Sequence, residues 1–212
     1  MVRASSQRSL ATVWNRPRRS PNFDKLAIQL SLEKDVTWLE FVEILPLPKY
    51  NLHATVEMIV ADRGDGRVAF DIVDERSTPD GDAYGLLLLA LEYHQIRLIQ
   101  MDDASINREP RAGNSLRIWE HRAHRIERGV VAAIDRALAG QQPVSVRRLA
   151  TLAGLSDPLP IVSALMCRGV LETDLSAEKF GLDSSVTRRW DFGVALTTHS
   201  RSAARLFARK KP

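Results

Sequence analysis

The sequence has little cysteine: Cys167 is the only one in 212 residues. A single cysteine excludes an intrachain disulfide and a zinc site built on cysteines. It is also what a protein of a reducing compartment would contain. We therefore expect a cytoplasmic protein in which Cys167 fills a small place in the core.

Long hydrophobic runs are missing too. The most apolar stretch, LLLLALEY at 86–93, is far shorter than the ~20 residues of a membrane span. The first residues include Arg3 and Arg8, with no apolar segment behind them of the length that a secretory signal needs. We expect no membrane association. Aromatic residues make up 6% of the chain, but 44% of it is hydrophobic, enough for a globular protein with a buried core.

Several chemical signatures are absent. No glycine-rich phosphate loop occurs, no Ser-His-Asp arrangement can be identified, and the histidines show no paired spacing with acids that would predict zinc. These absences argue against a nucleotide-binding loop, a serine hydrolase and a zinc enzyme.

Acidic residues are missing from both ends of the chain. Residues 1–22 carry five arginines and no acid, and residues 201–212 carry five cations and no acid, although the whole chain has a net charge of only +4. Such ends predict phosphate-binding arms, because each cation near a duplex releases a condensed counterion. A solubilising terminus remains the alternative. We assign residues 1–24 to a basic arm that includes Arg16, Arg18 and Arg19, and residues 192–212 to a basic tail.

The patterns from residue 35 to 101 predict an α/β fold with a mixed sheet. Apolar residues at steps of three and four predict a helix over 35–45, ended by Pro46 and Pro48. Two apolar runs around Arg63-Gly64-Asp65-Gly66 predict a hairpin over 55–74. A helix at 84–94 and a buried strand at 96–101 follow.

A long helix is predicted after Pro110, with an apolar stripe from Leu116 to Val130. Its other side gathers basic residues at helical spacing. We interpret these residues either as a surface for DNA phosphates or as a solvated face interleaved with Glu120 and Glu127. They are Arg117, His121, Arg122, His124, Arg125 and Arg128.

Three short helices, over 130–139, 145–153 and 157–168, precede a strand in GVLETDL. Ser145 and Ser156 are the expected N-caps. This order predicts a small winged-helix-like domain. Its third helix is apolar apart from Arg168, so we expect Arg147 and Arg148 on the preceding helix to contribute more to DNA binding.

The hairpin places Glu57 and Asp71 within apolar strands. They are either water-facing residues of half-exposed strands or ligands for a metal ion. Four stretches in order resemble the TnsA-type transposon endonucleases, which have a restriction-endonuclease-like fold. These stretches are QLSLEKD (29–35), HATVEM (53–58), GDGRVAFDIV (64–73) and NREPRAGNSLRIWEHR (107–122).

The resemblance implies a nuclease-like domain over 25–125 and a winged-helix-like domain over 126–191. It implies that Glu33, Glu57 and Asp71 are the catalytic carboxylates and that Glu57 and Asp71 hold Mg²⁺. Val73 stands where the family has a lysine, which predicts impaired catalysis. We expect a protein that binds double-stranded DNA in a transposition or recombination assembly, with a transposase or another recombination protein as partner. An active Mg²⁺-dependent endonuclease with a relocated cation and a protein-binding scaffold without nuclease activity remain as alternatives.

Overall fold

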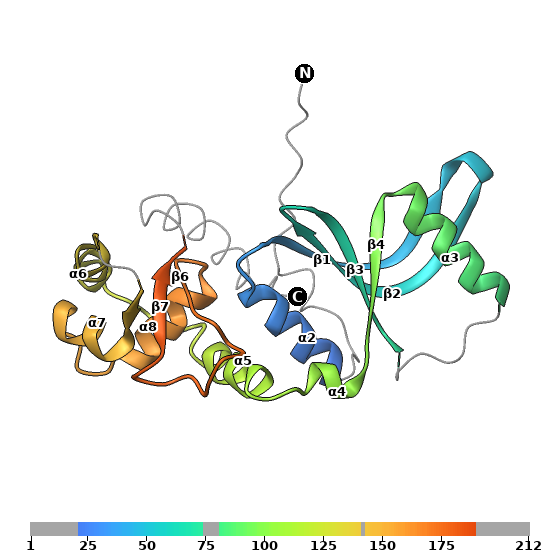
Figure 1. Ribbon diagram of the computed structural model, residues 1–212. Coiled ribbons are helices and arrows are strands. Elements are labelled where there is room, and N and C mark those ends of the chain that lie inside the picture. Colours follow the sequence, from blue (N-terminus) through green and yellow to red (C-terminus); the bar gives the residue numbers. More distant parts are fainter. Residues whose placement is uncertain (1–20, 74–80, 141–142, 190–212) are drawn as a thin grey trace, which may run out of the picture. The chain divides into compact units, whose positions relative to one another are not determined.

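The protein consists of two compact units in a computed structural model that describes residues 21–73, 81–140 and 143–189 (Figure 1). The first unit ends at Ile106 and the second begins at Asn107, with residues 31–34 counted in the second. The boundary therefore comes earlier than the one predicted after residue 125. Arg16, Arg18 and Arg19 and the C-terminal tail lie outside the described residues.

The first unit is a mixed α/β structure, as the sequence predicts. Its four-stranded sheet has the order β1-β2-β3-β4, in which β1, β2 and β3 are antiparallel neighbours and β4 pairs parallel to β3. The elements are α2 (Pro21–Leu32), β1 (Val36–Leu47), the 3-10 turn η1 (Pro48–Tyr50), β2 (Leu52–Arg63), β3 (Gly66–Ile72), α3 (Gly81–Tyr93), β4 (Ile96–Met101) and α4 (Asp103–Ile106).

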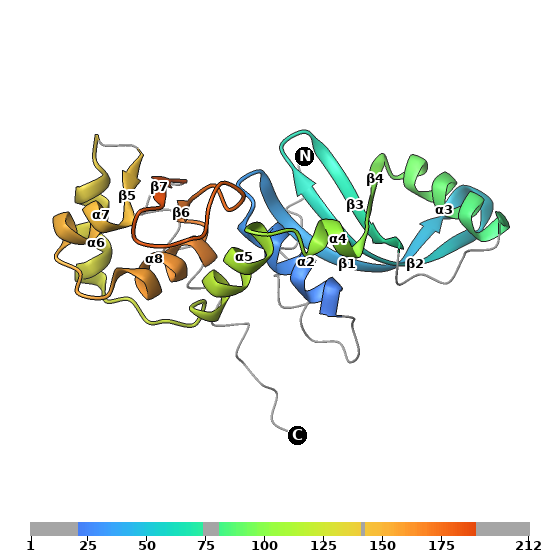
Figure 2. The same cartoon turned by 60° about the horizontal axis from the view of Figure 1, so that its bottom comes forward.

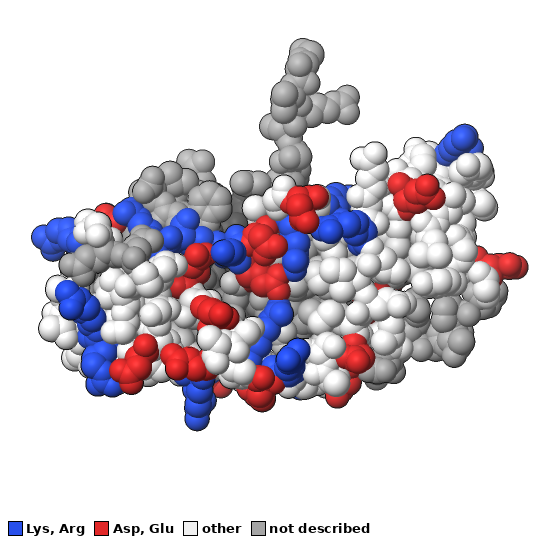
Figure 3. All heavy atoms as spheres, in the orientation of Figure 1, with Lys and Arg blue, Asp and Glu red and all other residues white. Residues whose placement is uncertain are grey.

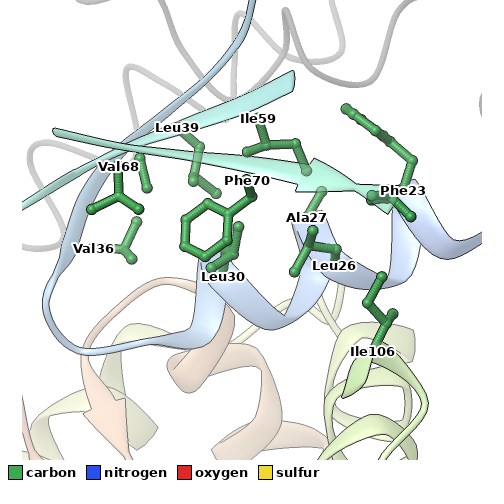
Figure 4. Close-up of a cluster of buried hydrophobic side chains, with 12 residues drawn as sticks. Phe23, Leu26, Ala27, Leu30, Val36, Leu39, Ile59, Val68, Phe70 and Ile106 are labelled. Carbon is green, nitrogen blue, oxygen red and sulfur yellow. The ribbon is translucent and has the colours of Figure 1, made fainter. Parts of the chain in front are cut away.

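Each face of this sheet has its own hydrophobic core because strand side chains alternate. One core joins α2 to residues such as Ile59, Val68 and Phe70 (Figure 4). The other joins α3 to residues such as Met58 and Ala69. Both strands of the hairpin are therefore covered on two sides, which explains their nearly continuous apolar runs.

The prediction of a helix over 35–45 is wrong, because these residues form β1. Register shifts between Val36 and Trp38 and between Val42 and Ile44 interrupt the strand's alternation. Buried residues consequently fall at Val36 and Leu39, three apart, and imitate a helical stripe. The β-branched and aromatic residues of VTWLEFVEILPL agree with a strand.

The predicted hairpin, the helix near 84–94 and the strand at 96–101 are confirmed. Arg63 pairs with Gly66, so the turn consists of Gly64 and Asp65. Gly66 has a φ of 127°, a conformation that favours glycine. The strand β4 is not buried as predicted: it lies at the edge of the sheet, and Ile99 is 36% exposed.

The second unit contains four helices and a small antiparallel sheet of order β5-β7-β6 among its described residues (Figure 2). No single helix in the described part of the chain is long and apolar enough to cross a membrane. The elements are α5 (Arg111–Glu120), α6 (Arg128–Leu138), β5 (Val144–Ser145), α7 (Val146–Ala153), α8 (Pro158–Cys167), β6 (Leu171–Glu172) and β7 (Ser185–Arg188).

The long helix predicted after Pro110 is instead two helices. α5 ends at Glu120, and residues 121–127 form a turn and an irregular segment before α6 begins at Arg128. The three shorter helices are confirmed within two residues. Ser145 caps α7 by accepting a hydrogen bond from Arg148 N (3.2 Å), but Asp157 rather than Ser156 occupies the N-cap of α8.

Candidate functional site

Asp71 lies inside the first unit, on the α3 side of the sheet. It follows Phe70, which points into the α2 core, and only 4% of its surface is exposed. Gln100 of β4 is its partner in the parallel register. Asp71 is therefore a buried polar residue of the sheet and does not face open water.

Glu57 points to the opposite side of the sheet. It stands between Val56 and Met58, whose side chains both belong to the α3 core, so its own side chain projects towards the α2 side and is exposed. The hairpin register agrees with this, because Ile59 and Phe70 are direct partners in the α2 core. The structure does not bring Glu57 and Asp71 together.

Glu33 belongs to the second unit and follows the last residue of α2. The resemblance implies the entry to a helix, but the helix ends at Leu32. Its carboxylate pairs with the guanidinium of Arg111 on α5. The carbonyl oxygens of Glu33 and Lys34 each accept a hydrogen bond from Arg189 Nη2 (2.8 Å). These contacts fasten residues 33–34 to α5 and to the end of β7.

The residues present do not fit the Mg²⁺ site that the resemblance implies. A divalent cation needs oxygens that converge on one point, whereas Glu57 and Asp71 diverge across the sheet. Among the described residues, no group of three or more His, Cys, Asp or Glu side chains is arranged to hold a metal ion. We derive no metal-dependent step for this site.

The two units differ in charge. The described part of the first unit has five Lys and Arg against twelve Asp and Glu, and that of the second has fourteen against ten. Figure 3 shows Lys and Arg side chains over the end of the second unit formed by α6 and α7. The described part of the first unit is therefore net acidic, and that of the second is net basic.

The basic residues predicted after Pro110 do not form one stripe. Arg117 is half-buried and donates to the carbonyl of Phe180 (3.2 Å), and His121 is half-buried at the end of α5. Arg122 is exposed but lies over the ring of Trp119, with 5.3 Å from its guanidinium carbon to the ring centre. Arg125, between the two helices, and Arg128, the first residue of α6, are also exposed.

Helix α8 has no residue that is classed as exposed and so offers little surface to a ligand. Every residue from Pro158 to Cys167 is buried or half-buried, and α8 packs against α5, α7 and β6. Arg168, which follows it, donates to the carbonyl of His124. This burial agrees with the apolar composition of the helix.

The preceding helix α7 presents two exposed cations. Arg147 and Arg148 both point to solvent, and the side chain of Arg148 has no hydrogen-bond or ion-pair partner within the described residues. Arg147 is paired with Asp183 of the loop at 173–184, which joins β6 to β7. We call this segment the β6–β7 loop.

Sequence reasoning missed the residue that holds the β6–β7 loop in place. Asn114 of α5 donates to the carbonyls of Leu175 (2.9 Å) and Glu178 (2.7 Å) and accepts from Phe180 N (2.8 Å). Asn114 is 2% exposed and Phe180 is 5% exposed. The sequence carries no signal for this role, because Asn114 precedes the apolar stripe predicted from Leu116 to Val130.

No family model matches the chain, and no curated protein matches it significantly.

Proposed function

We propose that this is a DNA-binding protein of a transposition or recombination assembly, in which a restriction-endonuclease-like unit has lost nuclease catalysis and a winged-helix-like unit contacts the duplex. One observation carries the proposal. The second unit combines a helix-strand-helix-helix-strand-strand order with a surplus of cations, several of them exposed on α6 and α7. This is the order expected of a winged helix.

The first unit supports the nuclease-like part of the proposal. A mixed sheet with α2 on one face and α3 on the other is the arrangement that the resemblance to TnsA-type endonucleases implies. The divergence of Glu57 and Asp71, together with Val73 at the lysine position, favours a role without phosphodiester cleavage. The acidic excess of this unit also disfavours close contact with phosphates.

The surface that we assign to DNA is centred on α7, not on α8. A helix that enters the major groove needs exposed side chains to reach base edges, and α8 has none. Arg147 and Arg148, with Arg128 on α6 and Arg125 before it, suit backbone phosphates. We therefore propose binding that depends on charge more than on base sequence.

Two measurements on the full-length protein test this proposal. Fluorescence anisotropy with a labelled duplex of roughly two helical turns is expected to show binding that weakens with salt, because phosphate contacts release counterions. Arg147→Ala and Arg148→Ala should each weaken binding more than Arg168→Ala, whose guanidinium is held by His124 O. Absence of salt-dependent binding would refute the proposal.

A plasmid-nicking assay tests the loss of catalysis. We expect no nicking with Mg²⁺ or Mn²⁺, either by the wild type or by a Glu57→Asp, Val73→Lys variant. The variant restores the residue types of the family but leaves its two carboxylates on opposite faces of the sheet. Metal-dependent nicking by the wild type would favour the active endonuclease instead.

A protein partner is a second candidate, favoured by exposed apolar side chains on the first unit. Leu88, Leu89 and Tyr93 of α3 are 43%, 40% and 48% exposed, and Ile44 and Leu52 near the tip of the β1–β2 hairpin are 56% and 52% exposed. His94 Nε2 lies 2.7 Å from Pro46 O and links these two regions. We propose this surface for a transposase or another recombination protein, since exposed apolar patches commonly mark interfaces.

A further inference from the structure

Arg147 and Asp183 form a two-point ion pair on the second unit. Arg147 Nε lies 3.0 Å from Asp183 Oδ1, and Nη2 lies 3.2 Å from Oδ2. This parallel fork is also the geometry with which an arginine binds a phosphate. The two side chains are 61% and 80% exposed, so a phosphate can reach the guanidinium once the carboxylate moves aside.

The backbone holds Asp183 opposite Arg147. The carbonyls on either side of Asp183 both accept hydrogen bonds from the first turn of α7: Arg147 N donates to Leu182 O (2.7 Å), and Val146 N donates to Ser184 O (3.0 Å). Most surface ion pairs must order two long, mobile side chains. Here the short aspartate side chain starts from a position that is already fixed.

The rest of the β6–β7 loop is acidic, with Asp174, Glu178 and Asp183 against one cation, Lys179. Next to Arg147 on α7, Arg148 is exposed and has no side-chain partner within the described residues. One of the two adjacent cations is therefore neutralised internally and the other is available to a ligand.

We infer that Asp183 occupies the place of a DNA phosphate on Arg147, so that the protein's own carboxylate competes with the duplex and limits its affinity. This inference rests on the proposed DNA-binding function and adds a residue that regulates it. The duplex engages Arg148 first, and a phosphate then displaces Asp183 from Arg147. The pairing lowers the pKa of Asp183 and raises that of Arg147, chiefly through their hydrogen bonds.

The test compares Asp183→Asn with Glu178→Gln in the full-length protein. Both variants remove one negative charge from the same exposed loop, but only Asp183 contacts a cation of α7. At low salt we expect Asp183→Asn to bind a labelled duplex about threefold to tenfold more tightly. The slope of log affinity against log salt should stay about the same, because the bound duplex contacts Arg147 in both proteins. Glu178→Gln should give a smaller gain and an unchanged slope.

A double variant isolates the pair. In an Arg147→Ala background, Asp183→Asn should increase the affinity for the duplex no more than Glu178→Gln does, because the arginine for which Asp183 and a phosphate compete has been removed. Equal gains for Asp183→Asn and Glu178→Gln in the wild-type background would overturn the inference while leaving DNA binding intact. Failure of the wild type and of every variant to bind would overturn both proposals. A thermal melt and an Asp183→Ser variant establish that any loss is not caused by unfolding.

Discussion

At the scale of single residues, three carboxylates of similar chemistry have three different environments. Asp71 is buried beside the α3 core, Glu57 is exposed on the other face of the sheet, and Glu33 is paired with Arg111. Two carboxylates share one metal ion only when their oxygens converge on one point. Side-chain direction, which strand alternation determines, therefore decides against a shared role for Glu57 and Asp71.

Cys167 provides a prediction about pH. Burial raises the pKa of its thiol to about 12, and the nearby Arg122 and Arg168 oppose this shift only in part. The thiol donates to Ile118 O (3.5 Å). The unfolded chain releases this proton near pH ~8.5. Above that pH the folded state binds more protons than the unfolded state, so the free energy of unfolding falls as pH rises.

The loss is at most about 1.4 kcal/mol per pH unit, and the partial exposure of Cys167 keeps it below that limit. Urea unfolding at pH 8 and pH 10, in the presence of a reductant, should show a larger loss for the wild type than for Cys167→Ala, by on the order of 1 kcal/mol. Equal losses would mean that the thiol is not protected in the folded state.

At the scale of elements, the spacing of apolar residues predicts helices and strands best where the element is regular throughout. The hairpin and β4 follow from apolar runs and the Gly64–Asp65 turn, and α6, α7 and α8 follow from their periodicity. The strand β1 could not be predicted because its two register shifts give it a helical spacing. Residues 121–127, where the helix is interrupted, include no glycine or proline, so the sequence does not predict the interruption.

The same limit applies to the candidate site. The sequence identifies Glu57 and Asp71 as unusual residues of apolar strands, but their relative direction depends on the register, which a one-residue shift reverses. Arg147 and Arg148 could be selected from their place on a helix. The partner of Arg147 could not, because Asp183 lies 36 residues further along the chain.

The side chain of Asn114 makes three hydrogen bonds to the β6–β7 loop. We therefore expect Asn114→Ala to destabilise the protein. The variant leaves the buried amide of Phe180 and two part-buried carbonyls without their partner. We expect a loss of roughly 2–4 kcal/mol in the free energy of unfolding, measured by urea denaturation. The Phe180 amide should also exchange faster with solvent.

Ser176→Ala is the matched control for Asn114→Ala. Ser176 is exposed on the same loop, and its backbone N, not its hydroxyl, bonds to Asp174 Oδ1 (2.8 Å). We expect a change within about 0.5 kcal/mol. Similar losses for the two variants would mean that Asn114 does not anchor the loop.

At the scale of the whole molecule, charge is divided along the chain. The first unit has an acidic excess, the second has a basic one, and each end of the sequence adds five cations. Like charges on a polyanion and on the first unit repel, so the DNA binding that we propose would involve the second unit and the basic ends. The overall charge of +4 conceals this division.

The basic ends give the last prediction. Removal of residues 1–20, which stops before α2 begins at Pro21, and of residues 201–212 should flatten the slope of log affinity against log salt. The expected change is up to ~0.9 for each phosphate that the shortened protein no longer binds. A full-length variant with Gln in place of the five arginines of residues 1–20 separates charge from length, because it keeps the arm but not its cations. If phosphate binding by these arginines is responsible, the arginine-free variant should reduce the slope as much as removal of residues 1–20 alone. If the slope is unchanged both in the shortened protein and in the arginine-free variant, the ends only increase solubility. The salt dependence would then come from α6 and α7.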